Sequence, residues 1–421
     1  MTRTSFHLKG NYAPVADELT AFDLPVTGAI PPELTGWYLR NGPNPRDESA
    51  HWFTGDGMIH GVRLENGRAA WYRNRWVRTR SFEDPSMRLR GPDGSRDLTA
   101  SLANTHVVNH AGRTLALVES SLPYEVTHEL ETVGPYDFHG KLHTAMTAHP
   151  KICPETGELH FFGYDVREPY VTYHRADAAG ELQLSRPIDV PGPTMMHDFT
   201  LTSRHVVFLD LPVVFDGARD GMPYHWDAGY GARIGVLSRE DPHGEVRWFT
   251  VDPCYVFHTL NAHEAGETIV LHVVRYAHLW WPGHEDAPST LWRWTIDLRA
   301  GTVREEQLDD RPCEFPRIDD RLAGLDVRYG HVTAGDALVR YDLHAGGSAA
   351  HTFTEGRTPG EAVFAPPNWL ITYVYDRARD SSDLVILDAT DLRAPVATVA
   401  LPSRVPAGFH GNWIADGHPG A

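Results

Sequence analysis

Four histidines in distinct short contexts are the residues of this chain best suited to chemistry: His149 in TAHPK, His197 in MMHDF, His258 in CYVFHTLNA and His410 in GFHGNW. Neutral imidazole is the commonest metal ligand in proteins, and an all-nitrogen set suits Fe, Cu, Zn or Ni better than Mg or Ca. Successive members of the set are 48, 61 and 152 residues apart, so no single helix or loop can gather them. If the four meet, they converge from separate parts of one closed scaffold, which points to a metal on the axis of that scaffold.

Counting alone does not select these four, because the chain has 25 histidines and an imidazole is more often an exposed polar group or a satisfied core group than a ligand. Each candidate lies at the edge of an apolar run typical of a strand, such as DFTLTSRHVVFLD or TIVLHVV. Another group alternates with polar residues, and we expect it on the surface: His106, His110, His139 and His143. The residues alone therefore predict a histidine metal site and no more.

Short strand-like runs separated by Gly, Pro, Asp and Asn turns recur from end to end and would have to position these histidines. The run 57–76 contains Asn66-Gly67, a strong hairpin signal, and similar runs cover 233–251, 331–343 and 369–388. Long amphipathic helix patterns are almost absent. Many short strands are typical of a sandwich, barrel or propeller, and at this length a propeller is favoured, because each added blade lengthens the chain without enlarging the core. No fixed-period repeat gives the blade count, and no break in composition divides the chain, which predicts one domain over residues 1–421.

Composition narrows the classes of partner and compartment. The formal net charge of −18 repels nucleic-acid phosphates, and no basic stripe offsets it, so nucleic-acid binding is not expected. No run of 18 or more apolar residues predicts a membrane-spanning helix, and the N-terminus lacks the pattern of a secretory signal. Three scattered cysteines (Cys153, Cys254 and Cys313) do not make a disulfide framework, so a reducing cytoplasm is expected.

With these segments in view, the chain resembles the carotenoid cleavage oxygenase family, which includes carotenoid-, apocarotenoid- and stilbene-cleaving dioxygenases. PPELTGWYLRNGPNP (31–45) and the run 51–79 resemble the N-terminal signature of that family. The later blocks follow in the family's order and cover essentially the whole chain: NTHVVNHAGRTLALVES, TAHPKICPETGELHFFGYD, MMHDFTLT, CYVFHTLNA, CEFPRID, GEAVFAPP and VPAGFHGNW. Several ordered blocks around four histidines make the resemblance specific.

The resemblance implies a seven-bladed β-propeller with a short helical or loop cap over an axial, non-haem Fe(II) ion. It implies His149, His197, His258 and His410 as the four iron ligands. A second set of family residues carries over as glutamates that hydrogen-bond three of these histidines: Glu119 in ALVES, Glu314 in CEFPR and Glu361 in GEAVF. A carboxylate on the far ring N–H fixes the tautomer of a ligand histidine and raises its basicity. Thr105, in ANTHVV, matches a family threonine near the sixth coordination position, where its methyl group limits access to the metal.

The implied reaction is cleavage of a conjugated C=C bond by O2 to give two carbonyl products. Stilbene-cleaving relatives have a lysine directly before the first glutamate, where this chain has Val118, and a paired tyrosine that falls near Phe82 here. An apolar residue at the place of a phenol clamp favours a carotenoid or apocarotenoid. Cleavage of a stilbene or phenylpropenoid is the alternative within the enzyme class, and a non-catalytic propeller that binds a lipophilic ligand is the alternative outside it. The expected partners are a lipophilic alkene and O2, with peripheral membrane contact left open as the route of substrate uptake.

Overall fold

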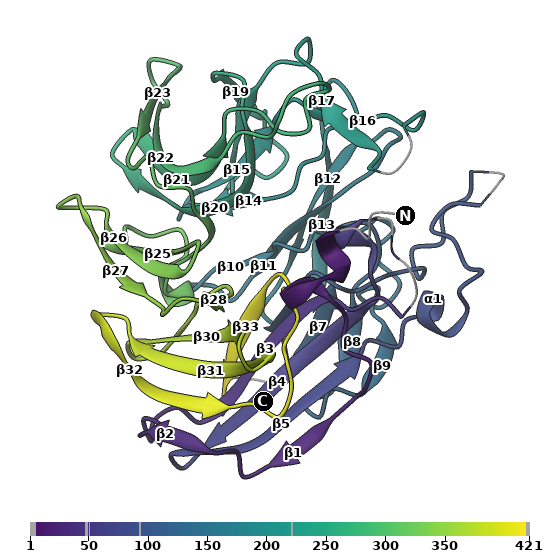
Figure 1. The fold of residues 1–421 in the computed structure, drawn as a ribbon. Coiled ribbons are helices and arrows are strands. Elements are labelled where there is room, and N and C mark those ends of the chain that lie inside the picture. Colours follow the sequence, from purple (N-terminus) through teal and green to yellow (C-terminus); the bar gives the residue numbers. More distant parts are fainter. Residues whose placement is uncertain (1–5, 47–48, 50, 92–93, 220–221, 418–421) are drawn as a thin grey trace. The chain divides into compact units, whose positions relative to one another are not determined.

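The computed structural model describes residues 6–46, 49, 51–91, 94–219 and 222–417, and nearly all of its regular structure is β (Figure 1). Within these ranges there is one α-helix, the four-residue α1 (Arg80–Glu83), and short 3-10 turns lie at Phe6–Leu8, Gly10–Tyr12, Trp52–Thr54 and Asp320–Leu322. No described helix has the length and apolar character needed to cross a membrane.

The strands of the described residues form eight sheets, seven of which have four or more strands. These seven are the blades of the seven-bladed β-propeller that the family resemblance implies, and the eighth is a two-stranded pair. By its internal contacts the chain divides into two compact units, of which the first comprises residues 1–143, 335–340 and 348–421 and the second residues 144–334 and 341–347. The single domain remains a prediction.

In the first unit, strands from the two ends of the chain complete sheets built mainly from other segments. The C-terminal β33 (Gly411–Ala415) pairs with β3 (Gly36–Pro43), and the N-terminal β2 (Val26–Gly28) pairs with β32 (Asp391–Ala400); Figure 1 shows yellow β33 beside purple β3. The sheet orders are β1-β5-β4-β3-β33, β6-β7-β8-β9 and β2-β32-β31-β30-β28, with β29 also paired to β30. The remaining strands of this unit are β1 (Thr20–Phe22), β4 (Gly57–Glu65), β5 (Arg68–Trp76), β6 (His106–His110), β7 (Arg113–Leu117), β8 (Tyr124–Val126), β9 (Thr132–Pro135), β27 (Ser348–Thr352), β28 (Arg357–Pro359), β29 (Val363–Ala365), β30 (Trp369–Asp376) and β31 (Ser381–Asp388).

The second unit contains three four-stranded sheets, of order β10-β11-β12-β13, β14-β15-β18-β19 and β20-β21-β22-β23, and the small sheet β16-β17. The boundary of the units falls within the sheet of order β24-β25-β26-β27, in which β24 and β25 belong to the second unit and β27 to the first. The strands of the second unit are β10 (Lys151–Ile152), β11 (Leu159–Tyr164), β12 (Val171–Ala176), β13 (Leu182–Ile188), β14 (Phe199–Leu201), β15 (His205–Asp210), β16 (Val213–Phe215), β17 (Tyr224–Trp226), β18 (Arg233–Ser238), β19 (Arg247–Thr250), β20 (Tyr255–Ala265), β21 (Thr268–Tyr276), β22 (Ser289–Asp297), β23 (Thr302–Gln307), β24 (Glu314–Arg317) and β25 (Tyr329–Ala334). Residues 337–340 of β26 (Ala337–Asp342) belong to the first unit and residues 341–342 to the second.

Local sequence explains the hairpin between β4 and β5. Asn66 and Gly67 connect the two strands and both have positive φ, 52° and 72°. A two-residue turn of this kind requires a left-handed backbone at both positions, which Asn and Gly adopt at the least cost. The predicted hairpin is therefore confirmed.

Each unit has its own apolar core between its sheets. In the second unit Trp294, Phe199 and Phe208 are fully buried in one continuous cluster, and in the first unit Tyr38 and Tyr373 belong to another. Burial on both faces explains why strands such as β15 read as continuous apolar runs rather than as alternating ones.

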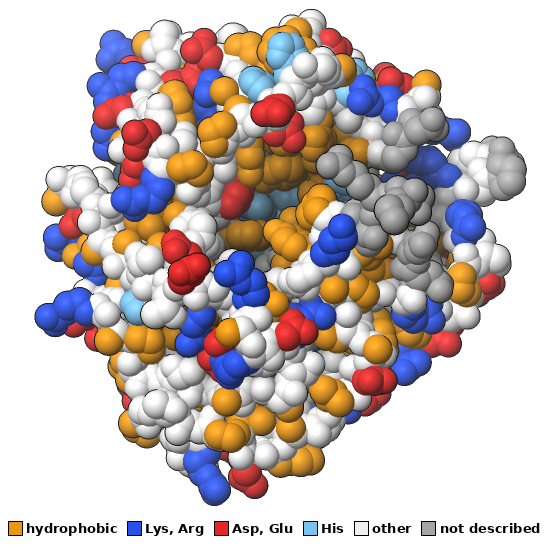
Figure 2. All heavy atoms as spheres, in the orientation of Figure 1, with side chains coloured by type: hydrophobic (Ala, Val, Ile, Leu, Met, Phe, Trp, Pro, Cys, Tyr) orange, Lys and Arg blue, Asp and Glu red, His pale blue; other side chains and the backbone are white. Residues whose placement is uncertain are grey.

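The surface assignment of four histidines is half wrong. His139 and His143 are exposed, but His106 and His110 are buried in β6. β6 is buried along its whole length, so polar residues between the apolar ones do not mark a solvent face there. On the face that Figure 2 shows, acidic and basic side chains of the described residues are intermingled rather than gathered by sign.

Candidate metal centre

The histidines named from the sequence lie at the beginning of edge strands. His149 and His197 stand two residues before β10 and β14, and His258 is the fourth residue of β20. His410 directly precedes β33. Each of these four strands is the edge strand of its sheet. The longer apolar runs after His149, His197 and His258 form the next strand of each sheet, namely β11, β15 and β21.

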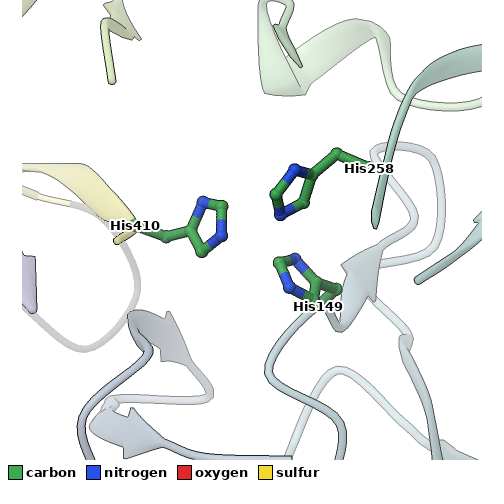
Figure 3. Close-up of side chains that lie close together, drawn as sticks. All are labelled: His149, His258 and His410. Carbon is green, nitrogen blue, oxygen red and sulfur yellow. The ribbon is translucent and has the colours of Figure 1, made fainter. Parts of the chain in front are cut away.

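Three of the four imidazoles, those of the second unit, converge. The Nε2 atoms of His149 and His197 are 3.0 Å apart, and ligand nitrogens of His149 and His258 lie within 4.8 Å of each other. The ring centroids of His197 and His258 are 5.3 Å apart. Figure 3 shows the rings of His149 and His258 turned toward one another, and it also draws His410, whose contacts within the first unit are given below.

The convergence suits a metal ion. Two nitrogen ligands at about 2.1 Å from one metal and at right angles to each other stand about 3.0 Å apart, by the usual metal–imidazole distance. The His149–His197 separation of 3.0 Å has this value. Nitrogens of His149 thus lie near enough to those of His197 and of His258 for these neutral imidazoles to be donors to a transition metal.

Glu314 holds His258 from behind. The Nδ1 atom of His258 lies 2.6 Å from Glu314 Oε2, which also accepts from the amide of Phe315 at 2.7 Å. The hydroxyl of Tyr276 donates to Oε1 at 2.9 Å. Burial alone would raise the pKa of Glu314, but His258 and these donors outweigh it, so the pKa lies below its ordinary value. A carboxylate on Nδ1 leaves Nε2 of His258 as the nitrogen for a metal.

Phe315 brings its own constraint to this pair. Its φ of 52° is unusual for a bulky residue, and its ring stacks on that of His258 at a centroid distance of 5.7 Å. The left-handed backbone coincides with the amide hydrogen bond to the carboxylate of the preceding residue and with the ring against the histidine. Strain of this sort persists only where the surroundings fix it, and it is frequent at functional sites.

In the first unit, His410 and Glu361 form a similar pair. Nδ1 of His410 lies 2.9 Å from Glu361 Oε1, and the amide of Gly411 donates to Oε2 at 2.8 Å. The backbone amide of His410 donates to the carbonyl of Thr105, and the amide of Thr105 donates to that of Leu117 at the end of β7. Thr105 therefore lies beside the His410 backbone. The ligand role of His410 and the gating role of Thr105 stay predictions.

The other predicted residues also lie in the first unit. Val118 is buried directly after β7, and Glu119, which follows it, is half-buried. Phe82 is buried in α1, with the guanidinium carbon of Arg46 3.6 Å above its ring. The metal-shell role of Glu119 and the substrate roles of Val118 and Phe82 stay predictions.

Sequence reasoning missed two residues next to the histidines. Tyr276 is the second side-chain donor to Glu314, and Asp198, directly after His197, is a buried acid. Asp198 had a visible signal, since it is a charged residue inside the apolar string MMHDF. Tyr276 had none, because its partner lies 38 residues away.

Known proteins are similar to this chain over almost its full length. The family profile described as retinal pigment epithelial membrane protein matches residues 12–415. A carotenoid cleavage oxygenase of Mycobacterium tuberculosis is 42% identical, over 97% of each chain. The chain belongs to the carotenoid cleavage oxygenase family. Solved structures agree: a lignostilbene dioxygenase of Pseudomonas brassicacearum superposes with a TM-score of 0.88 at 29% identity and 98% coverage of each chain.

A second solved relative is the Synechocystis apocarotenoid oxygenase, in a variant with a TM-score of 0.87 and 26% identity that covers 96% of this chain and 98% of its own. The same oxygenase has also been solved with cobalt. The comparisons confirm the family, the propeller fold and the dioxygenase class that the sequence predicts. A metal at this carotenoid cleavage oxygenase's histidines is consistent with its relatives, and the identity of that metal belongs to the proposal below.

Proposed function

We propose that this chain is an Fe(II) dioxygenase that cleaves a conjugated C=C bond of a carotenoid or apocarotenoid, with His149, His197, His258 and His410 as the metal ligands. One alkene and one O2 give two carbonyl products, so no external reductant is needed. The approach of His149 nitrogens to those of His197 and of His258, with His258 hydrogen-bonded by Glu314, is the observation that carries the proposal. The bound metal supplies a site at which O2 is activated beside the alkene.

The side chains of the site orient the metal ligands and restrict access to the metal. Glu314 on Nδ1 of His258 and Glu361 on Nδ1 of His410 fix the tautomer of each ring, so that Nε2 is the free donor. Because these carboxylates hydrogen-bond the far nitrogens of the imidazoles, the donor set offered to a metal would be neutral. Thr105 supplies, in this proposal, a methyl group that narrows access to the metal.

Aromatic side chains beside the histidines support an extended apolar substrate. Phe257 packs edge-on against the ring of His197 at 5.0 Å, and Trp280 packs against Phe257 at 5.9 Å. Trp281 continues this wall by stacking on Trp226 at 5.7 Å. A polyene needs such a surface and no charged partner, and the relative from Mycobacterium tuberculosis is named for carotenoid cleavage.

Stilbene cleavage is the second candidate, because the superposed Pseudomonas brassicacearum enzyme is a lignostilbene dioxygenase. Val118 argues against it, since a buried valine offers no hydrogen bond to a phenol. A lipophilic alkene is held in membranes, and the proposal includes peripheral contact with a lipid surface for its uptake, which sedimentation with lipid vesicles would reveal.

The test is anaerobic loading with Fe(II), then O2 uptake and product mass analysis with a panel of apocarotenals and, in parallel, resveratrol. His258→Ala should lose both the iron and the uptake. His243→Ala is the matched control, because His243 is an exposed histidine of the same unit, and it should retain both. Aldehydes from the polyenes alone support the proposal, and cleavage of resveratrol alone would overturn the substrate. Failure of the wild-type protein to bind iron would overturn the enzyme and favour the non-catalytic propeller.

A further inference from the structure

A buried carboxylate joins the segments that carry the three histidines of the second unit. Asp198 exposes 2% of its side chain and follows His197 directly. Its Oδ1 atom lies 2.8 Å from Nζ of Lys151, two residues after His149, and accepts from the amide of Phe199 at 2.8 Å. Its Oδ2 atom accepts from both the amide and the hydroxyl of Thr259, directly after His258, at 2.8 and 2.9 Å.

An irregularity in β20 accompanies the third of these connections. The pairing of β20 with β21 shifts register between Val256 and Thr259 and again before Asn261, so His258 lies in a bulged part of the strand. A bulge re-aims side chains and disrupts the local ladder of hydrogen bonds. The amide of Thr259 here donates to Asp198. The carboxylate therefore fastens the bulge that aims His258.

A second, shorter connection joins two of the same segments. The hydroxyl of Thr147, fully buried, accepts from the amide of His149 at 3.1 Å and donates to the carbonyl of His197 at 3.3 Å. Thr147 thus sets the His149 segment against that of His197, while Asp198 sets both against that of His258. Together they hold three chain segments that are far apart in sequence.

A general need for stability does not explain why a charge stands here. A buried carboxylate costs free energy unless it is paired and fully hydrogen-bonded, and an apolar residue at the same place would avoid that cost. Asp198 is fully satisfied, by four donors from three segments, each of which carries a predicted metal ligand within two residues. Directional hydrogen bonds fix distances that apolar packing leaves adjustable, which is what a metal site requires.

We propose that Asp198, neutralised by Lys151, is a positioning residue that sets the spacing of His149, His197 and His258 before the metal binds. This inference rests on the proposed function, because it takes the three histidines as ligands. It goes beyond that proposal in assigning the geometry of the site to a residue that touches neither metal nor substrate. Loss of Asp198 should therefore change how the metal is bound, besides lowering stability.

The test measures Co(II) affinity and the visible spectrum of bound Co(II), together with thermal unfolding of the metal-free protein. Asp198→Asn loses the charge and can no longer accept from all four donors. We expect Co(II) to bind several-fold more weakly, toward the lower end of the roughly 10–100-fold effect of losing a direct hydrogen-bond partner of a ligand, because Asp198 contacts the neighbours of the ligands and not their rings. The absorption bands should shift as well. Lys151→Arg, which keeps the ion pair, should retain most of the affinity.

Asp210→Asn is the matched control. Asp210 is as deeply buried in the same unit and is bound by Arg233 at 2.7 Å and by the hydroxyl of Tyr230 at 2.8 Å, but none of these residues adjoins a predicted ligand. It should lower the melting temperature and leave the Co(II) spectrum and affinity unchanged. If Asp198→Asn does not fold, Thr259→Val and Thr259→Ser replace it, with weakened binding expected from valine and recovery from serine.

The outcomes separate the two proposals. If wild-type protein fails to bind Co(II), or binds it equally well as His258→Ala, the proposed metal centre is wrong. If wild-type binding depends on His258 but Asp198→Asn has the wild-type affinity and spectrum, only the positioning role is wrong. Equal loss of affinity in the Asp198 and Asp210 variants would also overturn it, because that result marks a loss of general stability.

Discussion

Replacing Glu314 by glutamine tests how much of the metal affinity resides in one hydrogen bond behind a ligand. The carboxylate accepts three hydrogen bonds, at 2.6 Å from His258, 2.7 Å from the Phe315 amide and 2.9 Å from Tyr276. Glutamine of the same shape can direct its oxygen at His258 and its NH2 group at Tyr276, whose hydroxyl can turn to accept. The number of hydrogen bonds is then nearly conserved, and what is lost is the negative charge.

The magnitude follows from that difference. A hydrogen bond to a charged group contributes about 1.5–3 kcal/mol and one between neutral groups about 1 kcal/mol. Loss of charge assistance should therefore cost about 0.5–2 kcal/mol, or roughly 2–30-fold in metal affinity, since about 1.4 kcal/mol is tenfold. This range overlaps the lower part of the usual effect of outer-sphere mutations.

Competition of the protein with a chelator for Co(II) or Fe(II) measures the affinity, and Tyr276→Phe is the companion variant. Burial, followed by the neighbouring carboxylate, holds the pKa of Tyr276 far above its ordinary value, so this side chain is a neutral donor at any working pH. It contacts Oε1, away from the histidine. Its loss should weaken binding less than Glu314→Gln does. A wild-type metal affinity in Glu314→Gln, or a larger loss of affinity in Tyr276→Phe than in Glu314→Gln, would refute the argument.

Three further predictions concern substrate choice, acid stability and the core. Val118→Lys should gain turnover of a hydroxystilbene, measured by product analysis, because a lysine at this position can contact the phenolic hydroxyl. Loss of polyene cleavage alone would not support this substrate role. Burial would raise the pKa of Glu264, but hydrogen bonds from Thr202, Arg204 and His205 lower it to about 2, so this carboxylate stabilises the fold above its unfolded pKa of about 4.3 and that contribution is lost as pH falls toward 2. Glu264→Gln should be less stable than wild type at pH 7 and lose less stability between pH 4.5 and 2 in denaturant titrations. If the unfolding free energies of the two proteins fall in parallel with pH, Glu264 is not the source of this acid sensitivity. Phe208→Ala, at a fully buried position between Phe199 and Tyr173, should cost about 3–5 kcal/mol of unfolding free energy, and a cost below 1 kcal/mol would show that the core collapses around the gap.

Local features of the fold were predictable because their causes are local. Asn66-Gly67 alone specifies a turn with positive φ at both residues, and the β4–β5 hairpin follows from it. The position of His149 and His197 before apolar runs placed them at strand entrances, where the structure has them. The blade count was not readable in this way. The seven sheets contain four, five or six strands, and strands near the chain ends complete two of them, so no constant repeat length arises.

Features that depend on partners far away in the sequence could not be predicted from it. Burial of His106 and His110 is decided by what covers β6, and not by the polar residues between them. The bulge at His258 is fastened by Asp198, 61 residues before Thr259. The function of Tyr276 depends on a glutamate in another strand. A single sequence shows each residue type but not its partner, and these roles exist only in the pair.

In each unit, buried or half-buried acids hydrogen-bond the predicted ligands or their neighbours, and the imidazoles are left as neutral donors. Glu314 and Glu361 each stand on the far nitrogen of a histidine, and Asp198 is satisfied by Lys151 and by amides and a hydroxyl. In the proposed site, a carboxylate bound directly to the metal would lower the charge of the ion. When the carboxylate instead hydrogen-bonds Nδ1 of a ligand histidine, it makes the imidazole more basic and fixes the direction of the ring. In the proposed site the carboxylates would therefore orient the imidazoles without adding their own charge to the metal.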